Sequence, residues 1–111
     1  MPQIRKDAGL QTIITTFEVA PADCQALIDL LREACRDFVS KQPGFVSVAL
    51  HVNDARTRIA NYSQWRSRED FQALQRSDEM QAYLQRFLEL AKDYQPVMYD
   101  VVMVADADRQ A

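Results

Sequence analysis

The sequence is poor in the residues that build most cofactor and metal sites. It has one histidine, two cysteines and two glycines, and the glycines, Gly9 and Gly44, lie far apart. Glycine-rich phosphate loops of the Rossmann and Walker types need several glycines within a few residues, so the sequence excludes both. No CxxC or HxxxH spacing occurs, and a metal site would need His51 together with scattered carboxylates. We therefore predict no metal ion and no nucleotide bound through such a loop.

The two cysteines do not suit a disulfide. Cys24 and Cys35 fall eleven residues apart in one predicted helix, which corresponds to about 16 Å of helical rise. Disulfide partners need Cα atoms within about 7 Å. We therefore predict two free thiols, which fit a reducing compartment such as the cytoplasm.

Long apolar runs and an excess of positive charge are also missing. The longest apolar run, residues 101–105, is far shorter than the roughly 20 residues that span a bilayer. The first ten residues contain no apolar core of a signal peptide. With 13 basic and 16 acidic side chains the net charge is −3, which argues against nucleic-acid binding. We predict a cytoplasmic protein with no nucleic-acid or membrane partner.

The length and periodicity of the chain predict one domain. Its 111 residues are 48% hydrophobic and 26% charged, as in a soluble globular protein. Strand-like segments are expected at 11–19, 45–52, 57–66 and 96–106. A helix is expected from residues 20–23 to the stop signal Gln42-Pro43-Gly44, and a second helical stretch from 68 to 91, with a break at Ser77-Asp78. The domain spans 10–106, with an N-terminal arm at 1–9 and a C-terminal tail at 107–111.

The order β-α-β-β-α-β predicts a ferredoxin-like α+β fold with an antiparallel sheet. Helices in this fold lie on one face of the sheet, and the chain has no further element to cover the other face. Alternate strand residues leave several valine, leucine, isoleucine and methionine side chains as candidates for that face. A large exposed apolar face favours self-association. We therefore expect a homodimer.

Polar residues occur where a buried strand face is expected. Asn61, Ser63 and Trp65 alternate on the same face as Ile59 in the second strand of the hairpin. A buried amide needs hydrogen-bond partners, and an indole offers one donor. The side chains of Asn61 and Trp65 would lie about 13 Å apart along the strand, and they could contact the two ends of a flat aromatic ligand. Alternatively, Trp65 is a core aromatic and Asn61 bonds to the backbone.

Two cationic or titratable candidates depend on geometry that the sequence leaves open. A two- or four-residue hairpin loop puts His51 on the face opposite Asn61, whereas a loop one residue longer or shorter puts it on the same face. On that same face it could act as a general base near neutral pH. Arg86 falls beside the apolar stripe of its helix, so it reaches either a cleft or water.

The hairpin and the residues after it resemble a known family. The segment QPGFVSVALHVNDARTRIANYSQW, which continues as RSREDFQAL, is similar to the antibiotic biosynthesis monooxygenase family of dimeric α+β barrel proteins. The resemblance covers essentially the whole chain, and NYSQW followed by Ser67 is its most specific part. It implies a ferredoxin-like protomer that pairs with a second copy, and a pocket between sheet and helices. It also implies oxidation of aromatic polyketides, such as anthrones or phenols, by O2 without metal or flavin.

Position by position, the resemblance implies that Asn61 and Trp65 form the pocket pair and that His51 is the strand-end histidine. Two positions depart from the hydroxylating relatives. Phe71 stands where a tyrosine can occur, and Gln85 where an arginine can point into the pocket, with Arg86 one residue beyond. The expected catalytic residues are Asn61, Trp65 and His51. The expected substrate-binding residues are Phe71, Arg86, Ser63 and Ile59.

Three functions follow as hypotheses. The first is a cofactor-independent monooxygenase that acts on an aromatic polyketide, anthrone or phenol-like substrate. The second is a non-catalytic dimeric protein that binds or senses small aromatic or quinone ligands, because Phe71 and Gln85 lack the polar groups of the hydroxylases. The third is a cyclase or isomerase of a related polyketide that does not use O2.

Overall fold

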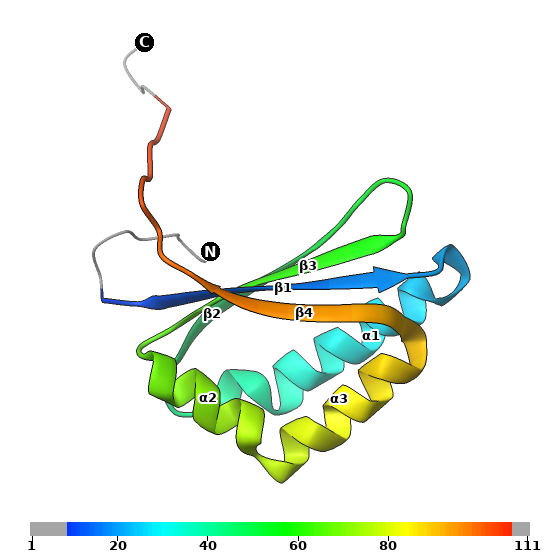
Figure 1. Cartoon of the computed structure of the whole chain (residues 1–111), viewed down its shortest axis with the longest axis horizontal. Coiled ribbons are helices and arrows are strands. Elements are labelled where there is room, and N and C mark those ends of the chain that lie inside the picture. The colour runs from blue at the N-terminus through cyan, green and yellow to red at the C-terminus, as the bar shows by residue number, and fades with distance from the viewer. Residues whose placement is uncertain (1–8, 108–111) are drawn as a thin grey trace.

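The computed structural model describes residues 9–107, and most of the expected N-terminal arm and C-terminal tail lies outside them. The elements follow the predicted order, with the second helical stretch divided in two (Figure 1). They are β1 (Gln11–Val19), α1 (Pro21–Asp37), the 3₁₀ turn Val39–Lys41, β2 (Phe45–Val52), β3 (Arg58–Trp65), α2 (Arg68–Arg76), α3 (Asp78–Leu90) and β4 (Ala91–Tyr99).

The four strands form one antiparallel sheet in the order β2-β3-β1-β4. All three α-helices lie on the same side of this sheet, and the other side carries no helix (Figure 1). The predicted ferredoxin-like α+β fold is therefore confirmed. We call the two sides of the sheet the covered face and the open face.

Local sequence explains where the helices begin and end. Pro21 occupies the first turn of α1, where its missing N–H costs no hydrogen bond. The Ser67 hydroxyl accepts from the backbone N–H of Asp70 at 3.1 Å and caps α2. Ser77 ends α2 through its N–H and starts α3 by accepting from the N–H of Met80 at 3.2 Å. The predicted break between the two helices is therefore confirmed, and one serine makes it.

The start of β2 differs from the expected strict alternation. Phe45 pairs with Trp65, whereas Ser47 pairs with Gln64, so a bulge lies between Phe45 and Ser47. The extra residue moves Phe45 onto the covered face, where its ring meets Trp65 edge-on at 5.5 Å. Without the bulge, strict alternation would place Phe45 on the opposite face from Val48.

The last strand is also displaced from its expected position at 96–106, since it spans Ala91–Tyr99. Its pairing with β1 ends at Tyr99, which lies opposite Thr12, and β1 itself begins at Gln11. Within the described part of the chain, residues 100–107 pair with no strand, and the apolar run 101–105 is not part of the sheet. The sequence did not predict the start of β4 at Ala91, because Ala91 also fits the apolar stripe of the preceding helix.

The covered face and the helices enclose the core. One cluster centres on Phe17, Leu27 and Ile59, and a second centres on Ile13, Trp65 and Phe71. Cys24 and Cys35 both lie in α1 as free thiols. Within residues 9–107, no helix is long and apolar enough to cross a membrane. In the same range, no three His, Cys, Asp or Glu side chains gather as metal ligands would.

Candidate functional site

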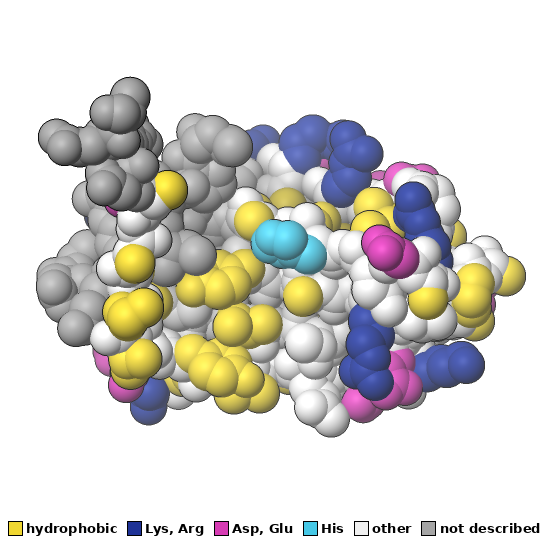
Figure 2. Space-filling model, turned by 90° about the horizontal axis from the view of Figure 1, so that it is seen from above, with side chains coloured by type: hydrophobic (Ala, Val, Ile, Leu, Met, Phe, Trp, Pro, Cys, Tyr) yellow, Lys and Arg dark blue, Asp and Glu magenta, His cyan; other side chains and the backbone are white. Residues whose placement is uncertain are grey.

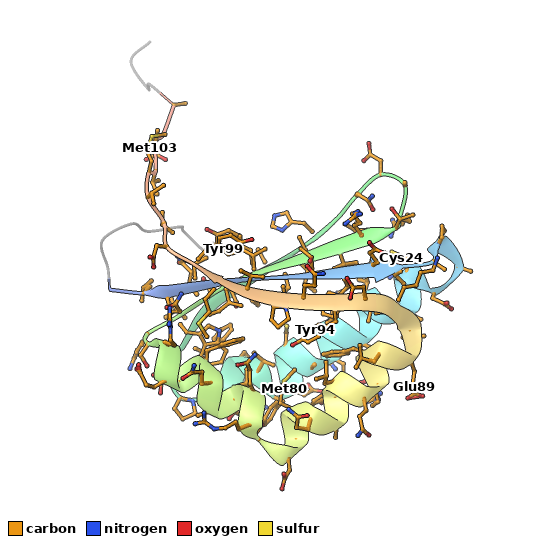
Figure 3. All side chains as sticks on the ribbon, in the orientation of Figure 1. Cys24, Met80, Glu89, Tyr94, Tyr99 and Met103 are labelled. Atoms are coloured by element: carbon orange, nitrogen blue, oxygen red, sulfur yellow. The ribbon has the colours of Figure 1, made fainter. Side chains whose placement is uncertain are left out.

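A cavity of about 180 Å³ lies between the covered face and the helices. Its floor comes from all four strands, and its roof comes from α1, α2 and α3. Figure 3 shows Tyr94 and Met80 entering this layer from the sheet and the helices, respectively. The walls are mainly apolar, as in most small-molecule sites. The side chains that carry polar atoms or a thiol are those of Thr15, Cys35, Asn61, Ser63, Trp65, Gln75, Gln81 and Tyr94.

The amide of Asn61 is the most unusual group in the cavity. Asn61 lies in the centre of the sheet, where it pairs with Leu50 of β2 on one side and with Thr15 of β1 on the other. Its Oδ1 atom is buried and has no hydrogen-bond partner among the described residues. Such an atom costs about 1–3 kcal/mol unless something satisfies it. A ligand or water in the cavity would remove this penalty.

Gln64 has the other buried side-chain oxygen without a partner in the described part of the chain. Its amide nitrogen, however, donates to the Thr12 hydroxyl at 3.2 Å. Gln64 points to the open face, since it neighbours the covered residues Ser63 and Trp65 in β3, and it does not line the cavity. The unsatisfied oxygen of Asn61 is thus the one placed to meet a ligand there.

Trp65 is held in place from three sides. Its ring packs against Phe45 at 5.5 Å and Phe71 at 5.8 Å between centroids. Its indole N–H donates to the Ser63 hydroxyl at 3.3 Å, and that hydroxyl donates to the backbone carbonyl of Ile13 at 3.5 Å. The indole is therefore not a free donor, and of the two alternatives for Trp65 the structure agrees with a core aromatic.

The roof of the cavity is apolar at its centre and polar at its edge. Phe71 and Leu74 are buried, whereas Gln75 is half-buried and Gln81 exposed. The side-chain amide of Gln81 donates to the backbone carbonyl oxygen of Gln75 at 2.6 Å, and this contact links α3 to α2. On the α1 side, burial raises the pKa of the Cys35 thiol, which keeps it protonated and a poor nucleophile near neutral pH.

The hairpin register decides the position of His51. Asn53 and Arg58 close a four-residue loop, and His51 pairs with Ala60. His51 is therefore on the open face, opposite Asn61, as one of the two alternatives predicted. The exposed imidazole lies on that surface in Figure 2. Within one chain it cannot act as a base on a ligand in the cavity.

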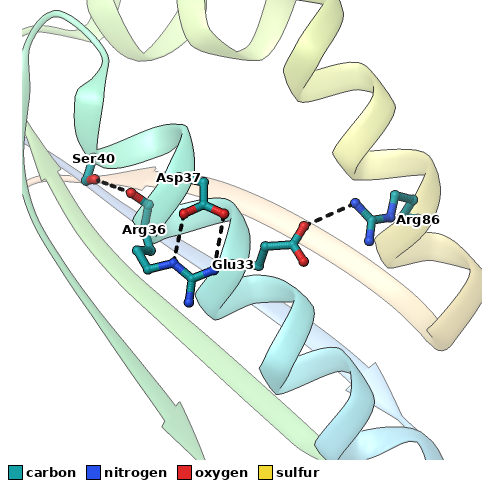
Figure 4. Close-up of polar contacts among 5 residues, drawn as sticks. All are labelled: Glu33, Arg36, Asp37, Ser40 and Arg86. Atoms are coloured by element: carbon teal, nitrogen blue, oxygen red, sulfur yellow. Dashed lines mark hydrogen bonds and ion pairs between the residues drawn. The ribbon is translucent and has the colours of Figure 1, made fainter.

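Two other candidates also lie outside the cavity. Ile59 is 1% exposed but belongs to the core cluster around Phe17 rather than to the lining. Arg86 pairs with Glu33 of α1 at 3.3 Å on the surface (Figure 4). Its guanidinium also lies 5.7 Å from the ring centre of Tyr83. Arg86 is thus an exposed link between α1 and α3, and the neighbouring Gln85 is exposed as well.

Of the seven site residues expected from the sequence, the structure brings together Asn61, Ser63, Trp65 and Phe71. Sequence reasoning missed Tyr94, which lines the cavity from β4 and lies opposite Phe17. Burial raises the pKa of its phenol, so the group stays a neutral hydrogen-bond donor. The signal was the alternation of Tyr94, Pro96 and Met98, but the strand was expected to begin only at residue 96.

The structure is a ferredoxin-like α+β protein whose apolar cavity holds one unsatisfied amide at the centre of the sheet. Comparison with known families identifies it further. Residues 10–86 match the antibiotic biosynthesis monooxygenase family, and the chain belongs to that family.

Individual relatives agree with this assignment. The tetracenomycin-F1 monooxygenase of Streptomyces glaucescens is 34% identical over 83 residues, which cover 75% of this chain and 74% of the relative. A monooxygenase from the gene ActVA-Orf6 of Streptomyces coelicolor, solved with the ligand nanaomycin D, has a TM-score of 0.78 at 22% identity and covers 91% and 95% of the two chains. SnoaB of Streptomyces nogalater, described as a cofactor-independent oxygenase, has a TM-score of 0.72 at 20% identity and covers 86% and 96%. The last two likenesses concern the fold.

Proposed function

We propose that the protein is a cofactor-independent monooxygenase that oxidises an aromatic, anthrone-like or phenol-like substrate with O2. The observation that carries the proposal is the unsatisfied amide of Asn61 in an otherwise apolar cavity. The 34% identity to a tetracenomycin-F1 monooxygenase supports the reaction class. In an anthrone, the reacting CH2 carbon becomes a carbonyl, one oxygen atom of O2 enters it, and the other leaves as water.

The residues of the cavity suit such a reaction. An electron-rich anthrone or phenol loses a proton through its own acidity, and the resulting anion reduces O2 directly. An amide offers both an acceptor and a donor, so Asn61 can hold a substrate hydroxyl and then the oxyanion. Preorganised donors of this kind contribute about 2.7–4 kcal/mol to the transition state. The apolar walls of Phe71, Leu74 and Phe87 exclude water from the reactive pair.

Oxygen uptake in the presence of an anthrone tests this function. We expect Asn61→Ala to lower kcat by about 10²–10³-fold, because the amide would no longer stabilise the oxyanion. Gln85→Ala, an exposed change on α3, is the matched control and should leave the rate unchanged. Turnover by Asn61→Ala at the normal rate would contradict the role of the amide. An unchanged rate in EDTA, with protein that shows no flavin absorbance, would support cofactor independence.

A second candidate function is a non-catalytic binding or sensing protein for small aromatic or quinone ligands. The specific observation is that the indole N–H of Trp65 is already bonded to Ser63, and that Phe71 adds only an apolar ring. Thermal shifts with a quinone, measured under nitrogen and in air, separate the two functions. Stabilisation by the quinone together with no oxygen consumption from an anthrone favours the sensor.

We further propose that the protein is a homodimer that buries the open face. Ala49, Tyr62, Ile14 and Val97 pair in sequence across all four strands and form an apolar row on that face, which we call the open-face row. Val97 is 42% exposed, and Val102 and Met103 beyond the sheet are 78% and 73% exposed. Figure 2 shows the hydrophobic side chains gathered on this side. A monomeric mass by light scattering at micromolar concentration would count against the dimer.

The two free thiols also support a cytoplasmic location. Cell fractionation with an antibody against the native protein would test it. Recovery in the culture medium or in a membrane pellet would contradict this part of the proposal.

A further inference from the structure

Two of the polar groups that line the cavity lie on opposite sides of its floor. Asn61 lies on β3 and Tyr94 on β4, with β1 between them. Thr15 of β1 pairs with Asn61, and Phe17, two residues further along, pairs with Tyr94. From the spacing of strands and residues, the two Cα atoms lie roughly 12 Å apart. The Asn61 Oδ1 atom has no partner among the described residues, so the Tyr94 hydroxyl does not donate to it, and one aromatic ligand can contact both groups.

The ring of Tyr94 is fixed, but its hydroxyl is available. The ring packs on Phe17 with 5.4 Å between centroids and 41° between planes. Within residues 9–107, none of the side-chain hydrogen bonds involves the Tyr94 hydroxyl. Tyr94 lines the cavity, and an O–H on a packed ring is a preorganised donor for an acceptor on a bound ligand.

We propose that Tyr94 is a second ligand contact, which donates its O–H to a carbonyl oxygen of the aromatic ligand while Asn61 accepts from a hydroxyl at the opposite edge. The pair thus selects ligands that carry a hydroxyl and a carbonyl on opposite sides of a ring system. The inference rests on the proposed aromatic ligand, but not on its oxidation. Tyr94 lies outside both the family motif NYSQW and the segment RSREDFQAL that follows it.

The size of the cavity sets the scale of a suitable probe. At about 180 Å³ it is close to the roughly 150 Å³ of an engineered cavity that accepts benzene. A single ring with two small substituents is therefore the right probe for the cavity as it stands. Para substitution puts the hydroxyl and the carbonyl at opposite ends, toward Asn61 and Tyr94.

Calorimetric titrations under nitrogen test the contact with three such probes. 4-Hydroxyacetophenone carries both groups, 4-methoxyacetophenone only the carbonyl, and 4-ethylphenol only the hydroxyl. We expect Tyr94→Phe to weaken the two carbonyl-bearing ligands about three- to tenfold, as for one lost hydrogen bond, and to leave 4-ethylphenol unchanged. Asn61→Ala should weaken binding of the two probes that carry a hydroxyl, 4-hydroxyacetophenone and 4-ethylphenol.

Tyr83→Phe is the matched control. It removes the same O–H from a tyrosine of the same layer, which stacks on Phe38 and Phe87 but does not line the cavity. Affinities unchanged in Tyr83→Phe but lowered in Tyr94→Phe support the contact. Equal losses in both variants, an equal loss for all three probes in Tyr94→Phe, or unchanged binding in Tyr94→Phe overturn it.

The titrations also separate this inference from the proposed oxidation. Selective weakening by Tyr94→Phe in a protein that consumes no oxygen with an anthrone would retain the contact and reject the monooxygenase. If the unaltered protein consumes oxygen with an anthrone but the Tyr94→Phe variant binds all three probes normally, the monooxygenase proposal is retained and the Tyr94 contact is rejected. If the unaltered chain binds none of the probes, the ligand class and the contact are both wrong.

Discussion

The two faces of the same sheet are both rich in apolar side chains, yet the structure gives them different environments. On the covered face, Ile13, Phe17 and Trp65 are 0–2% exposed. On the open face, the row formed by Ala49, Tyr62, Ile14 and Val97 remains partly or largely accessible. The unsatisfied amide of Asn61 faces the cavity, whereas His51 and its neighbour Ala60 face outward. This difference is the basis of our two proposals, ligand chemistry on the covered face and self-association through the open face.

The largest expected effect comes from emptying the covered face. Trp65→Ala removes a 1%-exposed indole that contacts Phe45 and Phe71, so we expect the free energy of unfolding to fall by about 3–5 kcal/mol. Tyr62→Ala, on the open face of the same strand, should cost clearly less. Urea denaturation at a fixed protein concentration measures both. Equal losses would erase the proposed difference between the faces.

A charge on the open face tests self-association directly. Val97→Asp places a carboxylate in the open-face row, next to Ile14. Burying it without a partner should weaken the dimer by about 100-fold or more. Light scattering across a dilution series reports the change, and Gln85→Asp, an exposed change on α3 away from the open face, is the control. A dimer as tight as that of the unaltered protein would move the interface elsewhere.

Replacing the amide of the cavity should separate stability from function. Asn61→Leu is close in shape and leaves no polar atom unsatisfied, so we expect the ligand-free protein to gain about 1–2 kcal/mol of unfolding free energy. Binding of hydroxyl-bearing aromatics and oxygen uptake should be lost. Urea denaturation with and without ligand measures both. A less stable Asn61→Leu protein would show that Asn61 has a structural partner.

The smallest effect concerns the thiol in the roof. Burial raises the pKa of Cys35 in the folded chain, so the unfolded chain loses that proton first as the pH rises. The contribution of this thiol to the free energy of unfolding is therefore fully present at neutral pH, and it is lost as the pH rises past about 8.5. Cys35→Ala should show a shallower decrease between pH 8 and 10. An identical slope in both proteins would mean that the thiol titrates normally.

Much of the fold could be predicted because local signals and tertiary structure agree. The β-branched segment of β1, the apolar stripe of α1 and the serine caps of α2 and α3 each specify their element without help from distant residues. The end of β4 could not be predicted in the same way, since the apolar run after Tyr99 has the composition of a strand. It lacks a neighbour because β1 begins at Gln11.

The candidate site could be predicted only where one strand carries it. Asn61, Ser63 and Trp65 share a face of β3, so alternation alone groups them, and Phe71 follows one turn into α2. Placing His51 needed the loop length of the hairpin, and placing Arg86 needed the position of Glu33 on another helix. Tyr94 meets the cavity through the pairing of β4 with β1, and its alternation with Pro96 and Met98 is informative only once the strand is known to begin at Ala91.

Gly44 has a consequence for the width of the cavity. It adopts a φ of +84°, and a Cβ at this position would collide with the Asp70 carboxylate in the first turn of α2. Phe71, the next residue, belongs to the roof over the ligand. The absence of a side chain at position 44 therefore sets how closely the roof helix approaches the sheet. A larger residue there would act as a wedge, and the protein could accept broader ring systems without any change in the residues that touch them.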